Sequence, residues 1–354
     1  MTLEIRLAQN NDADEWNSLI SQSPYGTIFH EWDWLKIAER HTGTRLFPLI
    51  GVKNNVPVGV FPLFFQKRGP IRMVFSPPPH AGLFYLGPVL IGCDTLRQEK
   101  IENISLEFQK SFDDFIENDL NARYVHVALS PALQDSRPFK WSGYHIQPNF
   151  DYAIDLSNGV DSLFASLDRK QRSDIKRAKE RDMSFEIGGE KEYEKILDLM
   201  NIRYAQQGKI VTVSKSYFMD LFKSYKNNIF VSSIKVDGEV VTGTLHIKYR
   251  DTMFNWQGNP KPSKPLTPSP NDLLIWESIR YACENCFHYY TTMSAAGNKR
   301  LHTYYAAKCN PALVIRYTAT KKSLVAGFFE KGYIRIVKPL REKAKYFGQR
   351  NGIQ

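Results

Sequence analysis

Residues 229–257 read IFVSSIKVDGEVVTGTLHIKYRDTMFNWQ, and this stretch decides the fold class. Apolar and polar residues alternate on both sides of Asp237-Gly238, a pair that is typical of tight turns between antiparallel strands. A second turn is expected at Arg250-Asp251. The three predicted strands are Ile229–Val236, Glu239–Tyr249 and Thr252–Gln257. Helical apolar spacing lies on either side of this meander, so we expect a mixed α/β fold.

A similar meander occurs earlier in the chain, with a polar turn at Asn54-Asn55. Its predicted strands are Leu46–Val52, Val56–Phe65 and Ile71–Ser76. The two meanders share a pattern rather than residues, which indicates an internal duplication of one module of about 150 residues. We therefore predict two lobes, each a mixed sheet flanked by helices, and a basic helical tail. The predicted ranges are 1–150, 151–320 and 321–354.

Helices and further strands complete both lobes. Ser269 as a cap and Pro270 at the first position predict a helix that runs to Cys283. Strands at about Leu313–Thr318 and His288–Thr292 are expected to complete the second lobe. Other predicted helices include Asp94–Asn118, Val160–Asp182, Glu190–Gln207 and Lys215–Tyr225.

The chain is basic, and its charge is uneven. Its 354 residues carry 47 Lys and Arg against 37 Asp and Glu, a formal net charge of +10. Residues 299–354 alone hold 13 basic and 2 acidic side chains. A basic tail favours a polyanionic partner, which can be nucleic acid, a phosphorylated substrate or an anionic membrane surface. The 42% hydrophobic content excludes a disordered or collagenous chain.

Four cysteines are too few for a disulfide scaffold in a chain of this length. Cys283-X-X-Cys286 with His288 lacks a second pair of ligands, so we expect no metal site. The acidic N-terminal segment is unlike a signal peptide, and no stretch reaches the roughly 20 apolar residues of a membrane-spanning helix. We therefore expect a cytoplasmic protein.

Several motifs occur in the order found in a known enzyme family. They are Pro24–Lys36 with its Tyr-Gly pair and Trp-X-Lys helix, Lys67-Arg68-Gly69, Tyr85–Val89, the basic stretch Arg172–Ala178 and Pro270–Glu277. This ordered set resembles the Fem-type (FemAB-like) aminoacyl and peptidyl transferases. The resemblance implies an α/β (α+β) chain with two tandem GNAT-like acyl-CoA N-acyltransferase lobes.

The resemblance also implies a function. Enzymes of this kind join an activated acyl or aminoacyl group to an amine acceptor, here expected to be a cell-envelope precursor such as that of peptidoglycan. The donor would be either aminoacyl-tRNA or acyl-CoA, with no cofactor held permanently. A phosphorylated acceptor and tRNA are therefore candidate partners, and the basic tail is a candidate for peripheral contact with an anionic membrane.

The family pattern suggests substrate-binding residues but assigns no catalytic residue. Thr291 stands where the family often has an acid, and Met293-Ser294 replace its Gly-Gly pair. Lys36 and an arginine near Gln207 are suited to bind phosphate, and Trp256 and Tyr304 are candidates for a pocket wall. The predicted substrate-binding residues are Trp34, Lys36, Arg203, Gln207, Trp256, Asn271, Tyr304 and Tyr305.

Two alternatives remain open at this point. The first is an acetyl-CoA-dependent GNAT N-acetyltransferase of a small or polymer-linked amine, although the loop that binds the coenzyme A diphosphate is missing. The second is a GNAT-like protein that has lost catalysis and binds nucleic acid or an anionic surface. Arg169–Arg181, with seven cations in thirteen residues, and the tail motivate this second alternative.

Overall fold

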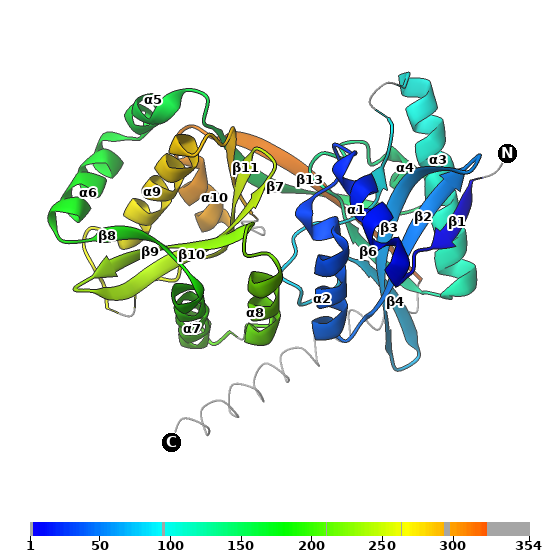
Figure 1. Cartoon of the computed structure of the whole chain (residues 1–354), viewed down its shortest axis with the longest axis horizontal. Helices are drawn as coiled ribbons and strands as arrows, with labels where there is room; N and C mark the ends of the chain where they lie inside the picture. The colour runs from blue at the N-terminus through cyan, green and yellow to red at the C-terminus, as the bar shows by residue number, and fades with distance from the viewer. Residues whose placement is uncertain (1–2, 94–95, 210, 263, 294–297, 324–354) are drawn as a thin grey trace. The chain divides into compact units, whose positions relative to one another are not determined.

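The computed structural model describes residues 3–93, 96–209, 211–262, 264–293 and 298–323 (Figure 1). Within them the chain forms two compact units. Unit 1 holds the described residues up to Asn149 together with Ile315–Ser323, and unit 2 holds those from Phe150 to Val314. The predicted tail helix falls almost entirely on residues 324–354, which lie outside the described residues.

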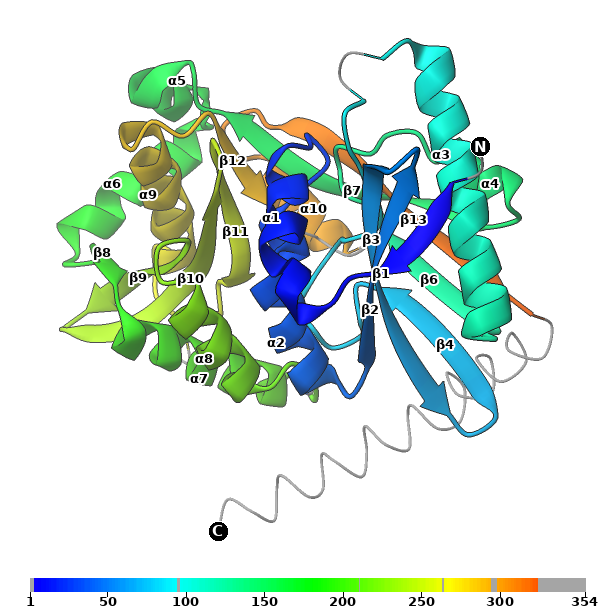
Figure 2. The same ribbon diagram turned by 45° about the vertical axis from the view of Figure 1, so that its right-hand side comes forward.

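Unit 1 is a mixed sheet with helices on both faces. Its strands lie in the order β1-β2-β3-β4-β6-β13, and only β4 and β6 are parallel neighbours. Helices α1 and α2 cover one face and α3 the other (Figure 2). The elements are β1 (Glu4–Leu7), α1 (Ala13–Ser21), α2 (Trp32–Thr42), β2 (Arg45–Lys53), β3 (Val56–Arg68), β4 (Ile71–Ser76), β5 (Val89–Leu90), α3 (Gln98–Asp114), β6 (Tyr124–Ala128), α4 (Arg137–Trp141) and β13 (Ala312–Lys322).

Large apolar side chains explain how α3 packs in unit 1. Phe108 and Phe112 are buried against sheet residues such as Phe61 and Val125. Gly51 and Gly59 leave room for the Phe108 ring, because a Cβ atom at either position would lie less than 3 Å from it. The aromatic residues of α3 therefore lie directly on the sheet, and their burial stabilises this layer.

Unit 2 repeats the arrangement. Its strands lie in the order β7-β12-β11-β10-β9-β8, and only β11 and β12 are parallel neighbours. Helices α7 and α8 lie on one face and α9 on the other (Figure 1). The elements are β7 (His145–Asp155), α5 (Gly159–Ser166), α6 (Arg169–Glu180), β8 (Ser184–Gly188), α7 (Glu190–Gln206), α8 (Lys215–Ser224), β9 (Ile229–Val236), β10 (Glu239–Tyr249), β11 (Thr252–Gly258), α9 (Pro270–Glu284), β12 (Tyr289–Thr292) and α10 (Lys299–Ala306).

The meander at residues 229–257 forms as predicted. Strands β9 and β10 have the predicted bounds, and β11 extends the third strand by one residue. Asp237 and Gly238 both have positive φ, 52° and 79°, as a two-residue turn of the primed type requires. The predicted mixed α/β class is confirmed.

The last strand is longer than predicted. We expected a strand at Leu313–Thr318 to complete the second lobe, and β13 runs from Ala312 to Lys322, with Thr318–Lys322 paired to β6 of unit 1. Strand β7, which the sequence analysis did not identify, pairs with β12 of unit 2. Local alternation identifies a strand but carries no information about its partners.

Two further predictions need correction. The helix predicted at Val160–Asp182 is two helices, α5 and α6, because the Asp168 side chain accepts the backbone N–H of Gln171 at 2.7 Å and starts a new helix. Lys321 and Lys322 belong to β13 rather than to a tail helix. Among the described residues, no helix is both long and apolar enough to cross a membrane.

Candidate functional site

Strand β12 of unit 2 ends before its parallel neighbour β11. Their pairing runs from Thr252 opposite Tyr289 to Asn255 opposite Thr292, and the Met293 N–H donates to the Asn255 carbonyl at 3.3 Å. Beyond this point, within the described residues, β11 continues to Gly258 paired with β10.

A bulge lies at the same point. His246 of β10 is opposite Asn255, and Leu245 is opposite Gln257, so Trp256 is an extra residue in β11. A bulge increases the local twist and redirects the backbone groups next to it. The Trp256 side chain is only 2% exposed and packs edge-on against Phe218 of α8 at 5.3 Å between ring centroids. It holds the bulge in place from within the core.

A polar cluster follows the end of β11. The Asn259 N–H donates to the Gly243 carbonyl at 2.8 Å, and its side chain accepts from Thr244 and donates to the Tyr305 hydroxyl at 3.2 Å. The Thr242 hydroxyl lies 2.7 Å from Asn271 Oδ1. We call Thr242, Thr244, Asn259, Asn271, Asp272, Tyr304, Tyr305 and Lys308 the unit 2 polar cluster.

Helix α10 and the residues after it contribute the other half of this cluster. The Tyr304 hydroxyl donates to the Asn271 carbonyl at 3.3 Å. The Lys308 ammonium group lies 2.6 Å from Asp272 Oδ1 and 4.4 Å from the centre of the Tyr304 ring. The Lys308 side chain is 7% exposed, so its charge is balanced by Asp272 and the ring rather than by water.

Burial sets the protonation of the two tyrosines. It raises the pKa of Tyr304 well above its usual value, with Asp272 as a further cause, and it also raises the pKa of Tyr305. Both phenols are therefore neutral near pH 7 and can donate hydrogen bonds. Neutral donors beside the end of β11 suit the stabilisation of a carbonyl oxygen that gains negative charge.

A second polar group lies under the sheet but is closed to solvent. The His246 ring nitrogen Nε2 lies 2.8 Å from the Ser232 hydroxyl, which lies 3.1 Å from the Ser278 hydroxyl of α9. Burial lowers the pKa of His246 to about 3. The imidazole is therefore neutral and fully buried, which makes it part of the core rather than a group that exchanges protons with a substrate.

The structure brings together three of the predicted residues. Asn271, Tyr304 and Tyr305 belong to the unit 2 polar cluster, and Trp256 lies three residues before Asn259 in the same strand and loop. Arg203 and Gln207 lie at the end of α7, where Arg203 donates to Gln206 at 3.3 Å and Gln207 is exposed. Whether they bind substrate stays a prediction.

The other two predicted residues lie in unit 1. Trp34 is fully buried in α2, with its ring 5.1 Å from that of Phe29. Lys36 pairs with Glu39 on the same helix, and the second carboxylate oxygen of Glu39 accepts the Leu46 N–H at 2.8 Å. A role for Lys36 in binding phosphate stays a prediction, and its ammonium group would have to leave Glu39 to fulfil it.

The sequence analysis did not predict Asp272, Asn259 or Lys308 as substrate-binding residues. Nothing in the local pattern connects Asp272 with Lys308, 36 residues later. One sequence signal could have pointed to Asn259, which directly follows a glycine at the end of a strand.

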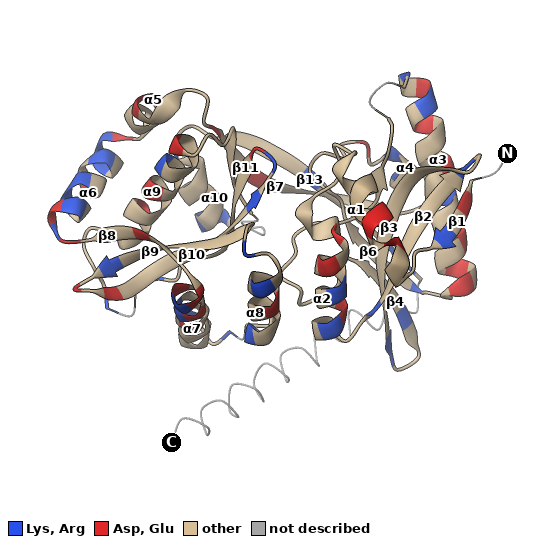
Figure 3. Ribbon diagram, viewed as in Figure 1, with Lys and Arg blue, Asp and Glu red and all other residues tan. Residues whose placement is uncertain are grey.

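Helix α6 is rich in Lys and Arg (Figure 3), and several of these cations form contacts inside unit 2. Lys179 lies 2.7 Å from the buried carboxylate of Glu277, and Arg172 donates to the Ala165 carbonyl at 2.7 Å. Arg181 donates to the Thr267 carbonyl, and Arg177 pairs with Asp174. The exposed cations left for an anionic partner are Arg169, Lys170 and Lys176.

The corresponding position in unit 1 is filled by the chain itself. After β4 and β6 pair as far as Ser76 opposite Val127, Leu86 forms a parallel bridge with Leu129 and donates to the Ala128 carbonyl at 2.8 Å. The Gly87 N–H donates to the Ser76 hydroxyl at 3.1 Å.

Possible metal ligands were also considered. Among the described residues, His, Cys, Asp and Glu side chains nowhere form a group of three or more that would suit a metal ion. Cys286 is exposed, and Cys283 donates to the Leu156 carbonyl at 3.5 Å.

Comparisons with known proteins agree with this geometry. Residues 165–300 match the family model described as "Acetyltransferase (GNAT) domain", which falls within unit 2. No curated protein sequence matches the chain. The crystal structure of FemX has a TM-score of 0.63 at 13% identity and covers 89% of this chain and 96% of its own.

Two further solved structures have the same fold. A tandem GNAT protein from the clavulanic acid biosynthesis pathway has a TM-score of 0.54 at 13% identity, over 90% of this chain and 98% of its own. The C-terminal domain of a putative lysylphosphatidylglycerol synthetase from Agrobacterium fabrum has a TM-score of 0.55 at 12% identity, over 91% and 95%. The predicted tandem GNAT-like fold and its likeness to FemX are confirmed.

Proposed function

We propose that this chain is an acyltransferase whose unit 2 joins an activated acyl or aminoacyl group to an amine acceptor. The observation that carries the proposal is that β12 ends opposite Asn255 while β11 continues to Gly258, next to the hydrogen-bonded pair Asn259 and Tyr305. The match of residues 165–300 to an acetyltransferase domain supports the same unit.

The proposed acyl transfer requires few side-chain groups. The amine nitrogen attacks the carbonyl carbon of an ester or thioester, a C–N bond forms, and the C–O or C–S bond breaks. The proton lost by the amine passes to the leaving group or to solvent. The carbonyl oxygen becomes negative in the tetrahedral intermediate, and the neutral Tyr305 hydroxyl beside the end of β11 is suited to stabilise it.

The acceptor and donor follow from the resemblance to Fem-type enzymes and from charge. We propose an amine on a cell-envelope precursor as acceptor, with aminoacyl-tRNA or acyl-CoA as donor. A phosphorylated acceptor or tRNA would find cations at Arg169, Lys170 and Lys176. Contact of the basic C-terminal residues with an anionic membrane is a further part of this proposal.

The test is an assay of the purified chain with two donor classes. Acyl-CoA and aminoacyl-tRNA are each incubated with peptide-bearing nucleotide-sugar precursors and with simple amines, and amide products are identified by mass spectrometry. Tyr305→Phe is expected to reduce kcat by about tenfold to a hundredfold, because one oxyanion donor is lost. Lys191→Met, at an exposed position of α7, is the control and should leave kcat unchanged.

The outcomes separate the alternatives. Product from acyl-CoA alone would establish the acetyl-CoA type of enzyme, and product from charged tRNA alone the Fem type. Absence of amide product with both donors, in a chain that is folded by thermal unfolding, would contradict the proposal.

A further inference from the structure

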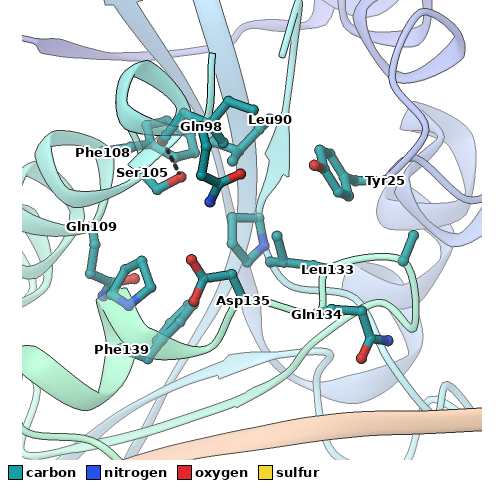
Figure 4. Close-up of a pocket in the computed structure, with 14 residues that line it drawn as sticks. Tyr25, Leu90, Gln98, Ser105, Phe108, Gln109, Leu133, Gln134, Asp135 and Phe139 are labelled. Atoms are coloured by element: carbon teal, nitrogen blue, oxygen red, sulfur yellow. Dashed lines mark hydrogen bonds between the residues drawn. The ribbon is translucent and has the colours of Figure 1, made fainter. Parts of the chain in front are cut away.

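A cavity in unit 1 has no part in the chemistry proposed above. It holds about 220 Å³ and lies between α3, β5, the loop after β6 and α4 (Figure 4). Tyr25 lies across the cavity from Ser105 and Gln109 of α3 (Figure 4). Pro88, next to the segment that fills the separated strands of unit 1, also lines it.

The floor of this cavity is apolar. Leu90, Phe108, Leu133 and Phe139 line it and are each 7% exposed or less. A cavity of about 150 Å³ with such a lining is large enough to bind benzene. The unit 1 cavity is therefore large enough for one aromatic or branched aliphatic group.

The polar lining presents several hydrogen-bond acceptors, beside one buried donor, the amide nitrogen of Gln109, which lacks a hydrogen-bond partner among the described residues. The Ser105 hydroxyl gives its proton to the Ile101 carbonyl at 2.7 Å, so its free capacity is as an acceptor. Gln98 donates to Glu102 at 2.9 Å and Gln134 to the Ile315 carbonyl at 3.0 Å, which leaves both amide oxygens as acceptors. Such a lining suits a ligand that carries N–H groups.

The charge of the lining also favours a cationic ligand. No Lys or Arg is among the lining residues, and Asp135 is. Arg137 binds Asp135 through two hydrogen bonds of 2.9 and 2.8 Å and Glu102 through one of 2.7 Å. This group of two carboxylates and one guanidinium has a net charge of −1, which disfavours a phosphate or carboxylate ligand and favours a cation.

We propose that the unit 1 cavity is a binding site for a primary amine that carries one small apolar group. The apolar group occupies the floor formed by Phe108, Leu133 and Phe139. The ammonium group lies among the acceptors of Gln98, Ser105 and Asp135. The site needs neither an acyl donor nor the unit 2 polar cluster, so its test is independent of the proposed function.

Three probes with one carbon skeleton test the charge preference. Binding of phenethylamine, 2-phenylethanol and phenylacetate to the full chain is measured by ligand-observed NMR and isothermal titration calorimetry. We expect the amine to bind about tenfold more tightly than the alcohol, since a charge-assisted hydrogen bond adds about 1.4 kcal/mol. Phenylacetate should bind more weakly than both.

Two variants locate the site. Ser105→Leu fills the cavity and should abolish binding of the amine, whereas Asn103→Leu, at an exposed position of the same helix, is the matched control. Asp135→Asn should weaken the amine about tenfold and leave the alcohol unchanged. Thermal unfolding checks that each variant is folded.

The proposal is overturned by any of four results. Phenylacetate could bind as tightly as the amine, Ser105→Leu could leave amine binding intact in a folded protein, or the amine could fail to bind up to its solubility limit. A loss of binding in both Ser105→Leu and Asn103→Leu would place the amine elsewhere and also overturns it.

Discussion

The ammonium group of Lys308 lies 2.6 Å from the carboxylate of Asp272, and this contact joins the first turn of α9 to the segment that follows α10. The two side chains are 7% and 24% exposed. This buried cation and the half-buried anion in the first turn of α9 form one side of the unit 2 polar cluster. The end of β11 forms the other side.

The first prediction concerns this ion pair. Asp272→Asn leaves the Lys308 charge buried without its carboxylate, so we expect a loss of about 3–5 kcal/mol in the free energy of unfolding. Lys308→Met removes the buried charge and leaves Asp272 able to reach water, so its loss should be about 1 kcal/mol. Urea unfolding of both variants measures the difference. Equal losses would show that burial of Lys308 does not control the energetics.

The second prediction concerns Gly258 at the end of β11. Its φ is +132°, and a Cβ atom there would lie 2.5 Å from the Gly243 carbonyl oxygen. We expect Gly258→Ala to destabilise unit 2 by more than about 2 kcal/mol, because backbone must move. Gly238→Ala is the matched control: φ is +79°, but no atom lies within 4 Å, so strain alone should cost about 1 kcal/mol. Denaturant midpoints of the two variants provide the comparison, and a milder effect at Gly258 would argue against the tight contact with β10.

The third prediction concerns His30, which holds the segment that fills the separated strands of unit 1. Its Nδ1 accepts the Thr27 N–H at 3.2 Å, and Nε2 donates to the Gly87 carbonyl at 3.3 Å. Burial lowers the pKa of His30 from 6.5 to about 4. The unfolded chain therefore binds more protons than the folded chain between pH 4 and 6.5, and stability falls as the pH falls through this range.

The contribution of His30 to this loss is about 3 kcal/mol. His30→Gln should reduce the difference in unfolding free energy between pH 7 and pH 4.5, whatever its effect at pH 7. His288→Gln, at a side chain that is 74% exposed, is the control and should keep the difference. An unchanged pH dependence in His30→Gln would show that the imidazole is not held neutral.

The fourth prediction concerns Asp113, whose contribution to stability changes with pH in the opposite direction to that of His30. Burial raises the pKa of Asp113 in α3, although the Tyr144 hydroxyl donates to it at 2.6 Å. In the pH range above 3.8 the folded chain holds this proton more tightly than the unfolded chain, so the stability that it contributes decreases as the pH rises.

Asp113→Asn removes this titration and keeps an acceptor for Tyr144. We expect the variant to gain stability relative to the wild type as the pH is raised from 4 to 7, measured by urea unfolding at each pH. Asp114→Asn, at the exposed neighbouring position, is the control and should follow the wild type. A constant difference between Asp113→Asn and the wild type across this range would contradict the prediction.

Much of the candidate site could be reached from the sequence through the family resemblance. Asn271, Tyr304 and Tyr305 were predicted together and lie together. Asn259 was missed because its role depends on a contact with Tyr305, 46 residues away in the chain, and the pairing of Lys308 with Asp272 spans 36 residues. Trp34 was predicted for binding and is buried beside Phe29, since aromatic type alone does not distinguish a pocket wall from a core.

The sequence by itself determined those helices, strands and turns that depend on preferences between neighbouring residues. Alternating residues and the Asp237-Gly238 turn specify the β9–β10 hairpin, and Ser269-Pro270 marks the start of α9, because these preferences act between neighbours in the chain. Only the tertiary structure decided which strand completes each unit, that Leu86 and Gly87 fill the separated strands of unit 1, and that β12 ends opposite Asn255 of β11. These outcomes depend on pairings between distant segments, and local sequence patterns do not specify a partner.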